Sequence, residues 1–168
     1  MTRYNIRIGL GHDTHRLGDG SFVLLGGVRI EHTQSLLGHS DADVLLHAVT
    51  DALLGAAGLG DIGEFFPDTD PANRNRDSGE MLKTVWNKVR QQRWQIVNLD
   101  VVLFAEKPKI TPYKEAIRKR IAELLDIDAS QVGLKAKTGE QIGIIGREEA
   151  MSAECVILLE KERCAVDG

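Results

Sequence analysis

The sequence has few aromatic residues (5%), two cysteines and no long apolar run. No stretch approaches the roughly 20 apolar residues that span a bilayer, and residues 1–10 lack the apolar core of a signal peptide. Cys155 and Cys164 form no Cys-x-x-Cys pair, and a reducing compartment would keep both as thiols. We therefore expect a cytoplasmic protein with Cys155, which lies in an apolar run, inside the core.

Basic residues are also scarce, with 21 Lys and Arg against 25 Asp and Glu and a net charge of −4. This balance argues against a nucleic-acid-binding protein, which needs a basic stripe to contact phosphates. The acidic residues concentrate in residues 1–80, which hold 12 of them against 6 basic ones. All five histidines (His12, His15, His32, His39 and His47) also lie there. Carboxylates and imidazoles together suggest a bound cation.

The length of 168 residues and the hydrophobic content of 42% suit one folded domain, residues 1–168. Periodicity predicts strands at residues 4–11, where Ile6, Ile8 and Leu10 share one side, and at 94–105, 132–137 and 153–160. Residues 22–25 and 28–30 flank Gly26-Gly27 as a hairpin. Helices are predicted from Ser40 or Asp41 to the glycines at 55–60, from Asp77 or Ser78 to about Gln92, and over 112–125. We therefore expect an α/β or α+β fold: a mixed sheet with helices packed on one face, plus a small β-ribbon.

The Asp13-Thr14-His15 segment is the strongest candidate for metal binding. Residues two apart in an extended chain project to the same side, so Asp13 and His15 can reach one ion. A third ligand is expected from the helix, where Asp43, His47 and Asp51 share a face. Imidazole and carboxylate without thiolate suit Zn²⁺ or a similar divalent ion. The alternative is that Asp13 caps a turn and that the helix residues form a solvated or capping face.

Two further segments have a ligand interpretation and a structural one. Residues 38–43 can bind a phosphate at a helix N-terminus beside His39, or Ser40 can simply cap that helix. Residues 66–71 can form a rigid turn or a lid over a ligand. Residues 135–140 end a strand at a glycine, where Thr138 and Glu140 are candidates for phosphate and metal contacts.

Together these blocks resemble the 2-C-methyl-D-erythritol 2,4-cyclodiphosphate synthase family of the non-mevalonate isoprenoid pathway, over essentially the whole length. The matching blocks are residues 7–15, 24–30, 39–44, His47 with 50–55, 60–63, 65–70, 135–140 and 146–147. The length leaves no room for the cytidylyltransferase domain fused to some members, so we expect a stand-alone synthase.

The resemblance implies a Zn²⁺ or similar divalent ion on Asp13, His15 and His47. It implies a second divalent ion, Mg²⁺ or Mn²⁺, held by Glu140 and substrate phosphates. His39 and Thr138 would be catalytic residues that stabilise the reacting phosphate. Substrate contacts are implied for Asp13, His15, His39, Thr138 and Glu140. They are also implied for Ser40, Asp61, Gly63, Phe66, Asp68, Asp70, Ala105, Pro108, Lys109, Ile144 and Arg147. In the family, the segment around Lys109 recognises cytosine largely through backbone groups.

The resemblance also implies a homotrimer with its sheets around a central axis and each active site between neighbouring subunits. Arg147 and Glu149 match positions lining a central cavity that can hold an isoprenoid diphosphate. Three positions depart from the common pattern: Arg16-Leu17 after the Asp-x-His motif, the basic and polar segment 73–76, and Glu148 where glycine is common. The extra acid at Glu148 argues against anion binding in that cavity.

The implied reaction is a metal-assisted intramolecular phosphoryl transfer. The 2-phosphate of 4-diphosphocytidyl-2-C-methyl-D-erythritol 2-phosphate attacks the β-phosphorus, and CMP leaves. Two alternatives remain open, a zinc-dependent phosphohydrolase and a trimeric module that binds metal and nucleotide without turnover. No membrane or nucleic-acid partner is expected.

Overall fold

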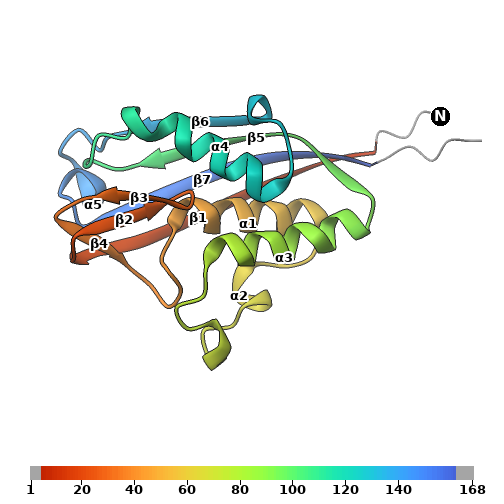
Figure 1. The fold of residues 1–168 in the computed structure, drawn as a ribbon, viewed down its shortest axis with the longest axis horizontal. Helices are drawn as coiled ribbons and strands as arrows, with labels where there is room; N and C mark the ends of the chain where they lie inside the picture. Colours follow the sequence, from red (N-terminus) through yellow and green to blue (C-terminus); the bar gives the residue numbers. More distant parts are fainter. Residues whose placement is uncertain (1–4, 162–168) are drawn as a thin grey trace, which may run out of the picture.

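Strand β1 (Ile6–Asp19) is the longest strand of the computed structural model, which describes residues 5–161. It belongs to a five-stranded sheet with the order β4-β1-β7-β5-β6 (Figure 1). β5 and β6 are parallel and the other neighbours are antiparallel, so the sheet is mixed, as the sequence predicts. Its other strands are β4 (Gln34–Leu37), β5 (Trp94–Phe104), β6 (Val132–Lys137) and β7 (Ala150–Lys161).

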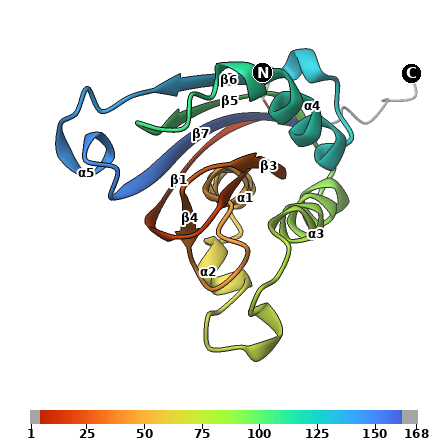
Figure 2. The ribbon, with the colours of Figure 1, turned by 60° about the vertical axis from the view of Figure 1, so that its left-hand side comes forward.

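Three helices cover one face of this sheet: α1 (Val44–Ala57), α3 (Ser78–Gln91) and α4 (Lys114–Leu125) (Figure 2). All three confirm predicted helices. The connections contain the short helices α2 (Ile62–Phe65) and α5 (Gly143–Gly146) and 3₁₀ turns at Pro71–Asn73, Thr111–Tyr113 and Ala129–Gln131. Within residues 5–161 no helix is both long and apolar enough to cross a membrane.

The predicted β-ribbon is a separate two-stranded sheet of β2 (Phe22–Leu25) and β3 (Val28–Glu31). Gly26 and Gly27 form its turn with φ of 63° and 74°. Two successive positive φ angles define the two-residue turn that matches the twist of a hairpin, and glycine adopts them without strain.

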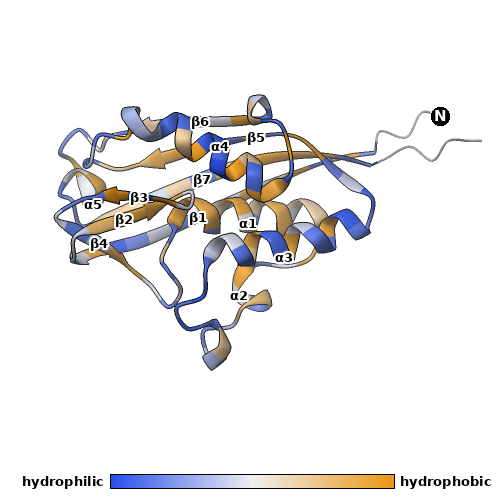
Figure 3. Ribbon diagram, in the orientation of Figure 1, coloured by the Kyte–Doolittle hydropathy of each residue, from blue (hydrophilic) through white to orange (hydrophobic). Residues whose placement is uncertain are grey.

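The hydropathy of the helices follows their position (Figure 3). α1 is apolar around most of its circumference because it lies between the sheet and α3, and twelve of its residues are buried. α3 buries one stripe of residues and leaves its charged side exposed. Cys155 is fully buried in the core, which confirms its predicted place, whereas Cys164 lies outside the described residues.

The two faces of β1 differ in an unexpected way. Ile6, Ile8 and Leu10 share a side as predicted, but that side is exposed at 54%, 70% and 65%. The buried side carries Gly9 and Gly11, because α1 packs so closely that a Cβ on Gly11 would lie 2.1 Å from the carbonyl oxygen of Ala48. The glycines therefore set the distance between β1 and α1.

Several predicted boundaries are wrong. The first strand continues to Asp19, because pairing with β7 and β4 keeps the Asp13-Thr14-His15 segment extended. β4 was not predicted, since four residues give too short an alternating pattern. α1 begins at Val44 with Asp43 as its N-cap, so neither Ser40 nor Asp41 caps it. Its predicted glycine end is confirmed by Gly58, which has φ of 70°.

Candidate functional site

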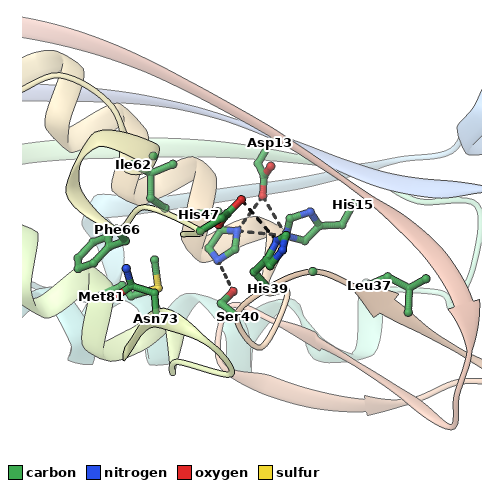
Figure 4. A pocket seen from close by; sticks show the side chains of 13 residues that line it. Asp13, His15, Leu37, His39, Ser40, His47, Ile62, Phe66, Asn73 and Met81 are labelled. Atoms are coloured by element: carbon green, nitrogen blue, oxygen red, sulfur yellow. Dashed lines mark hydrogen bonds and ion pairs between the residues drawn. The ribbon is translucent and has the colours of Figure 1, made fainter. Parts of the chain in front are cut away.

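Three side chains converge where β1 passes α1 (Figure 4). Asp13 and His15 project from the helix-facing side of β1, and His47 projects from the first turn of α1. Asp13 Oδ2 lies 2.9 Å from His47 Nδ1 and 3.4 Å from His15 Nε2, and the two ring nitrogens are 3.2 Å apart. Among residues 5–161 this is the one group of at least three His, Cys, Asp or Glu side chains placed to hold a metal ion.

The donor set and its spacing fit a tetrahedral cation site. Bonds of about 2.0–2.1 Å to a tetrahedral ion place neighbouring ligand atoms about 3.3 Å apart, close to the three distances between these atoms. One carboxylate oxygen and two imidazole nitrogens suit Zn²⁺ or a similar divalent ion. Three protein ligands leave a coordination position for a substrate, as in catalytic metal sites.

The protonation of Asp13 and His15 also favours cation binding. Burial raises the pKa of Asp13, but the hydrogen bond with His47 and the positive charges of both histidines outweigh it, so this pKa lies below its ordinary value. Burial lowers the pKa of His15, although the charge of Asp13 opposes the shift. A carboxylate and a neutral imidazole, the forms that bind metal, are therefore favoured at neutral pH.

A pocket of about 570 Å³ opens beside these three side chains. The predicted site residues His39, Ser40, Gly63, Phe66 and Asp68 line it. Gly38, from the predicted phosphate segment 38–43, also lines it. Sequence reasoning did not assign the rest of the lining to the site, namely Leu37, Ile62, Asn73 and Met81. These residues come from four separate segments and carry no chemical motif, so only the fold identifies them.

The start of α1 is built differently from the prediction. Asp43 is fully buried, and its carboxylate accepts hydrogen bonds from the N–H groups of Leu46, Gly26 and Gly27 at 3.1, 2.9 and 2.6 Å. It therefore caps α1 and attaches the ribbon to it. Burial raises the pKa of Asp43, and these backbone hydrogen bonds oppose the shift. The capping interpretation of Asp43 is confirmed, and His47 is the helix residue that faces Asp13 and His15.

Several acidic residues near the pocket hold the backbone. Asp51 Oδ1 accepts the N–H of Ile62 at 3.1 Å, which joins α1 to α2 and places Asp51 outside the metal group. Asp61 caps α2, and Asp70 caps the 3₁₀ turn at Pro71–Asn73. Asp68 instead pairs with His39 at 3.4 Å, with both side chains 70% exposed.

The polar segment 73–76 is part of the framework. Asn73 is buried, and its side-chain amide donates a hydrogen bond to the carbonyl of Pro67 at 3.0 Å. Arg76 donates to Asn73 Oδ1 at 3.0 Å, and its guanidinium lies 4.8 Å from the ring centre of Phe66. These contacts hold the residue 66–71 turn in place beside the pocket.

Sequence reasoning also missed Asp41 and Ser78, which lie behind His47. Ser78 Oγ is 2.9 Å from His47 Nε2 and donates a short hydrogen bond to Asp41 Oδ1. Ser40 Oγ is 3.0 Å from the same ring nitrogen. Asp41 and Ser78 are 37 positions apart in the chain, so no local spacing could reveal their contact.

The other predicted substrate and catalytic residues lie at a second place, the carboxyl ends of β5 and β6. The Ala105 N–H donates to the Lys137 carbonyl, and Thr138 Oγ1 donates to Glu140 at 2.7 Å. β6 is three strands from β1, about 14 Å at ordinary strand spacing. Neither this group nor the exposed residues Ile144 and Arg147 on and beside α5 line the metal-side pocket. The remaining members of the group are Pro108 and Lys109.

Residues 6–160 match the family model described as the YgbB family. The chain belongs to the YgbB family. Two curated relatives named 2-C-methyl-D-erythritol 2,4-cyclodiphosphate synthase show how similar its members are. That of Listeria monocytogenes serotype 4b (strain F2365) is 53% identical over 156 residues, covering 93% of this chain and 99% of the relative. That of Shouchella clausii (strain KSM-K16) is also 53% identical over 156 residues, covering 93% and 98%.

Solved structures place this YgbB-family chain among the same enzymes. It matches the bifunctional IspDF of Campylobacter jejuni with a TM-score of 0.91 and 43% identity. That alignment covers 95% of this chain and 43% of the longer one, so the chain spans less than half of that protein. A Plasmodium falciparum IspF structure, described as a CDP complex, matches with a TM-score of 0.84 and 34% identity over 96% of this chain and all of that one. The resemblance found in the sequence is confirmed.

Proposed function

We propose that the protein converts 4-diphosphocytidyl-2-C-methyl-D-erythritol 2-phosphate to 2-C-methyl-D-erythritol 2,4-cyclodiphosphate and CMP, in the non-mevalonate synthesis of isoprenoid precursors. The observation that carries this proposal is the Asp13, His15 and His47 group beside a pocket, in a chain that shares 53% identity with enzymes of that name. Multiply charged phosphate esters cross membranes poorly, which supports a cytoplasmic location.

The proposed reaction forms one phosphorus–oxygen bond and breaks another. An oxygen of the 2-phosphate bonds to the β-phosphorus, and the bridge from the β-phosphorus to the α-phosphate oxygen breaks, so that CMP leaves with that oxygen. Zn²⁺ on Asp13, His15 and His47, with Mg²⁺ or Mn²⁺ near Glu140, would neutralise the phosphates and stabilise charge in the transition state. The chain supplies no nucleophile, and its task is to bend the substrate into a ring-closing shape.

Residues of the pocket suit this positioning task. Ser40 Oγ and the His39 ring lie beside the metal group, where they can donate hydrogen bonds to phosphate oxygens. Thr138 would serve the same purpose from the carboxyl end of β6. Ile62, Phe66 and Met81 form an apolar wall suited to the methylerythritol carbons, and Leu37 lines the opposite side (Figure 4), since apolar lining is typical of small-molecule sites.

We also propose that the active site is completed by a second copy of the chain in a homotrimer. The group around Lys109, Thr138 and Glu140 is too far along the sheet to contact the metal group of its own chain. The exposed apolar side chains Ile6, Ile8, Leu10 and Val156 lie on the sheet face that the helices leave open. Association through this open face would bury them and bring different copies side by side.

An isoprenoid diphosphate in the central cavity stays a prediction from the resemblance. In this chain Arg147 is paired with Glu149 at 2.8 Å, and Glu148 is paired with Lys107 at 2.7 Å. Arg147 and Lys107 therefore already have carboxylate partners. This pairing supports the expectation that Glu148 disfavours an anion there.

The proposed activity is tested by incubating the purified protein with the substrate, Zn²⁺ and Mg²⁺ and recording ³¹P spectra. We expect the cyclic diphosphate and CMP in equal amounts. Free phosphate or a linear monophosphate would indicate a phosphohydrolase, and binding without turnover would indicate a metal and nucleotide module. Either result would refute the proposal.

The matched variants for this assay are two aspartates on the same strand. Asp13→Ala removes a metal ligand, so we expect the rate to fall by several orders of magnitude while the circular dichroism spectrum is unchanged. Asp19→Ala, at the exposed end of β1, should keep the wild-type rate. A near-normal rate for Asp13→Ala would remove Asp13 from the ligand set.

A further inference from the structure

A buried hydroxyl group lies behind the candidate metal site. Ser78 is the first residue of α3 and is fully buried, yet Asp77 serves as the N-cap of that helix. The Ser78 hydroxyl is therefore free to bond elsewhere. Its Oγ lies 2.9 Å from Nε2 of His47, on the side of the ring opposite the nitrogen that faces Asp13 and His15.

The carboxylate of Asp41 decides the direction of this hydrogen bond. Asp41 Oδ2 accepts the backbone N–H of Ser78 at 3.0 Å, and Oδ1 accepts its hydroxyl in a short hydrogen bond. A carboxylate accepts hydrogen bonds and a hydroxyl has a single proton. Because Asp41 takes that proton, Ser78 Oγ can only accept from His47, and Nε2 must carry the hydrogen.

The proton on Nε2 determines what the other ring nitrogen can do. A neutral imidazole has one N–H and one lone pair. With one hydrogen fixed on Nε2, the proton that Nδ1 shares with Asp13 in the metal-free protein is the one that a cation displaces. The lone pair this leaves on Nδ1 lies 2.9 Å from Asp13 Oδ2 and 3.2 Å from His15 Nε2. That is the nitrogen aimed at the position of a cation.

We propose that Asp41 and Ser78 are positioning residues that hold His47 in the metal-binding tautomer. This inference rests on the proposed function in that the group at Asp13, His15 and His47 binds zinc, but it does not depend on the reaction. Carboxylates that orient a metal-bound histidine usually accept its N–H directly. Here the Ser78 hydroxyl lies between His47 and Asp41. It donates its proton to Asp41 and accepts the N–H of His47.

The segments that carry Asp41 and Ser78 are hydrogen-bonded to each other. The Asp41 N–H donates to the Arg76 carbonyl at 3.2 Å, and the Asn75 N–H donates to the His39 carbonyl at 2.8 Å. The segment before α1 is thereby bonded to the segment before α3.

Ser40 supplies a second acceptor for the same N–H. Its Oγ lies 3.0 Å from His47 Nε2 and accepts the Ala42 N–H at 3.2 Å. Loss of Ser78 alone therefore leaves a partial substitute. The two serines differ in their exposure: Ser40 lines the pocket, whereas Ser78 is fully buried.

The test measures zinc affinity by competition with a chromophoric chelator, in the absence of substrate. Loss of an outer hydrogen-bond partner typically weakens metal affinity 10–100-fold. We expect about tenfold weaker binding for Ser78→Ala and about a hundredfold for Ser40→Ala combined with Ser78→Ala. Thr84→Ala removes a hydroxyl from the same helix, where it bonds only the Glu80 carbonyl, and should bind zinc as the wild type does.

Asp41→Asn is the sharper variant because it reverses the direction of the hydrogen bonds that join Asp41, Ser78 and His47. One Asp41 oxygen accepts the Ser78 N–H at 3.0 Å, and the other accepts the Asp43 N–H at 3.3 Å. The shorter contact is the stronger one, so in the variant we expect the amide oxygen to accept the Ser78 N–H. The amide NH₂ then faces Ser78 Oγ and turns the hydroxyl proton toward His47 Nε2. The ring must move its own hydrogen to Nδ1, so we expect zinc affinity below that of Ser78→Ala.

A spectroscopic measurement separates this role from simple structural support. In the zinc-loaded protein, ¹⁵N spectra should show a protected Nε2–H on His47, and this proton should exchange faster with water in Ser78→Ala. Thermal unfolding with excess chelator measures separately the stability that Ser78→Ala loses with its buried hydrogen bonds, whereas Thr84→Ala should unfold close to the wild type. Zinc affinities of Ser78→Ala and Asp41→Asn within about threefold of the wild type would overturn the proposal. Absence of CMP formation in the wild type would refute the proposed reaction and leave these measurements unaffected.

Discussion

Burial of His15 makes the stability of the metal-free protein depend on pH. Burial lowers its pKa below 6.5, although the charge of Asp13 opposes the shift. Near this pH the unfolded chain binds more protons than the folded chain, so the free energy of unfolding falls as the pH decreases from about 6.5. We expect urea unfolding with EDTA present to show a midpoint that declines between about pH 7 and pH 5.

The control for this pH dependence is a second histidine. Burial also lowers the pKa of His32, which therefore contributes with the same sign. His15→Gln and His32→Gln should each flatten the decline in part, and the double variant should flatten it further. A double variant with the full wild-type decline would contradict this explanation.

At the residue scale, the sequence predicts ligands on a strand better than ligands on a helix. The period of two in an extended chain is enough to pair Asp13 with His15. It did not select the third ligand among Asp43, His47 and Asp51, although it favoured a surface or capping role for Asp43 and Asp51. The choice depends on how α1 is rotated against β1, and that rotation is set by packing across the sheet. The contact between Ser78 and His47 depends on the placement of a third element, so no local pattern could predict it.

At the scale of elements, the contact between β1 and α1 positions the candidate metal ligands. A Cβ at Gly11 would lie 2.1 Å from the Ala48 carbonyl oxygen and 2.5 Å from the Ala52 nitrogen. Both are backbone atoms, so Gly11→Ala must push α1 away from the sheet, and overpacking of this kind costs about 1–3 kcal/mol or more. We expect a lower free energy of unfolding and weaker zinc binding, measured by urea titration and chelator competition.

Gly55→Ala is the matched control for this substitution. Gly55 lies within α1, and a Cβ there would meet only the Leu10 carbonyl oxygen at 3.9 Å. Alanine is favoured over glycine in a helix by about 1 kcal/mol, so this variant should be as stable as the wild type or more so. Equal stability of the two glycine variants would show that the close approach at Gly11 does not matter.

The sequence predicts the elements with long patterns and misses those that depend on their neighbours. The three main helices, the hairpin and the strands β5, β6 and β7 follow from periodicity and turn residues. β4 has four residues, and it is a strand because β1 pairs with it. Ile6, Ile8 and Leu10 give a correct strand, but their pattern cannot reveal that the glycine side of β1 is the buried one.

At the scale of the whole molecule, the open face of the sheet is the proposed contact between subunits. Leu10 is 65% exposed in the single chain, so a charge there costs the isolated subunit little but would be buried on association. We expect Leu10→Lys to convert a trimer, with three times the chain mass of 18.5 kDa, into monomers. Analytical ultracentrifugation measures this change, and turnover should fall with it because the site would lack the residues at the ends of β5 and β6.

The control places the same charge on the other side of the molecule. Gln91→Lys lies at the exposed end of α3 and should leave the mass and the rate unchanged. A trimeric Leu10→Lys protein, or a wild-type protein that sediments as a monomer, would refute the proposed assembly.

The division of the site into two places on one chain is also visible only in the whole molecule. The sequence shows the metal motif and, with a weaker signal, the Thr138-Gly139-Glu140 motif. Their separation follows from the strand order, in which β7 and β5 lie between β1 and β6. Strand order is set by long-range pairing, and the sequence patterns predict a mixed sheet without specifying it.

The alternation of β1 has a consequence for insertions and deletions. Even-numbered positions from Ile6 to Leu10 face the open side of the sheet, and odd-numbered positions from Gly9 to His15 face α1. Deleting one residue between Leu10 and Asp13 would move the residues on one side of the deletion to the other face of the sheet. Either isoleucine and leucine would then face α1 while the candidate ligands stay in place, or the reverse. The length of this part of the strand is therefore constrained to change by two residues or not at all.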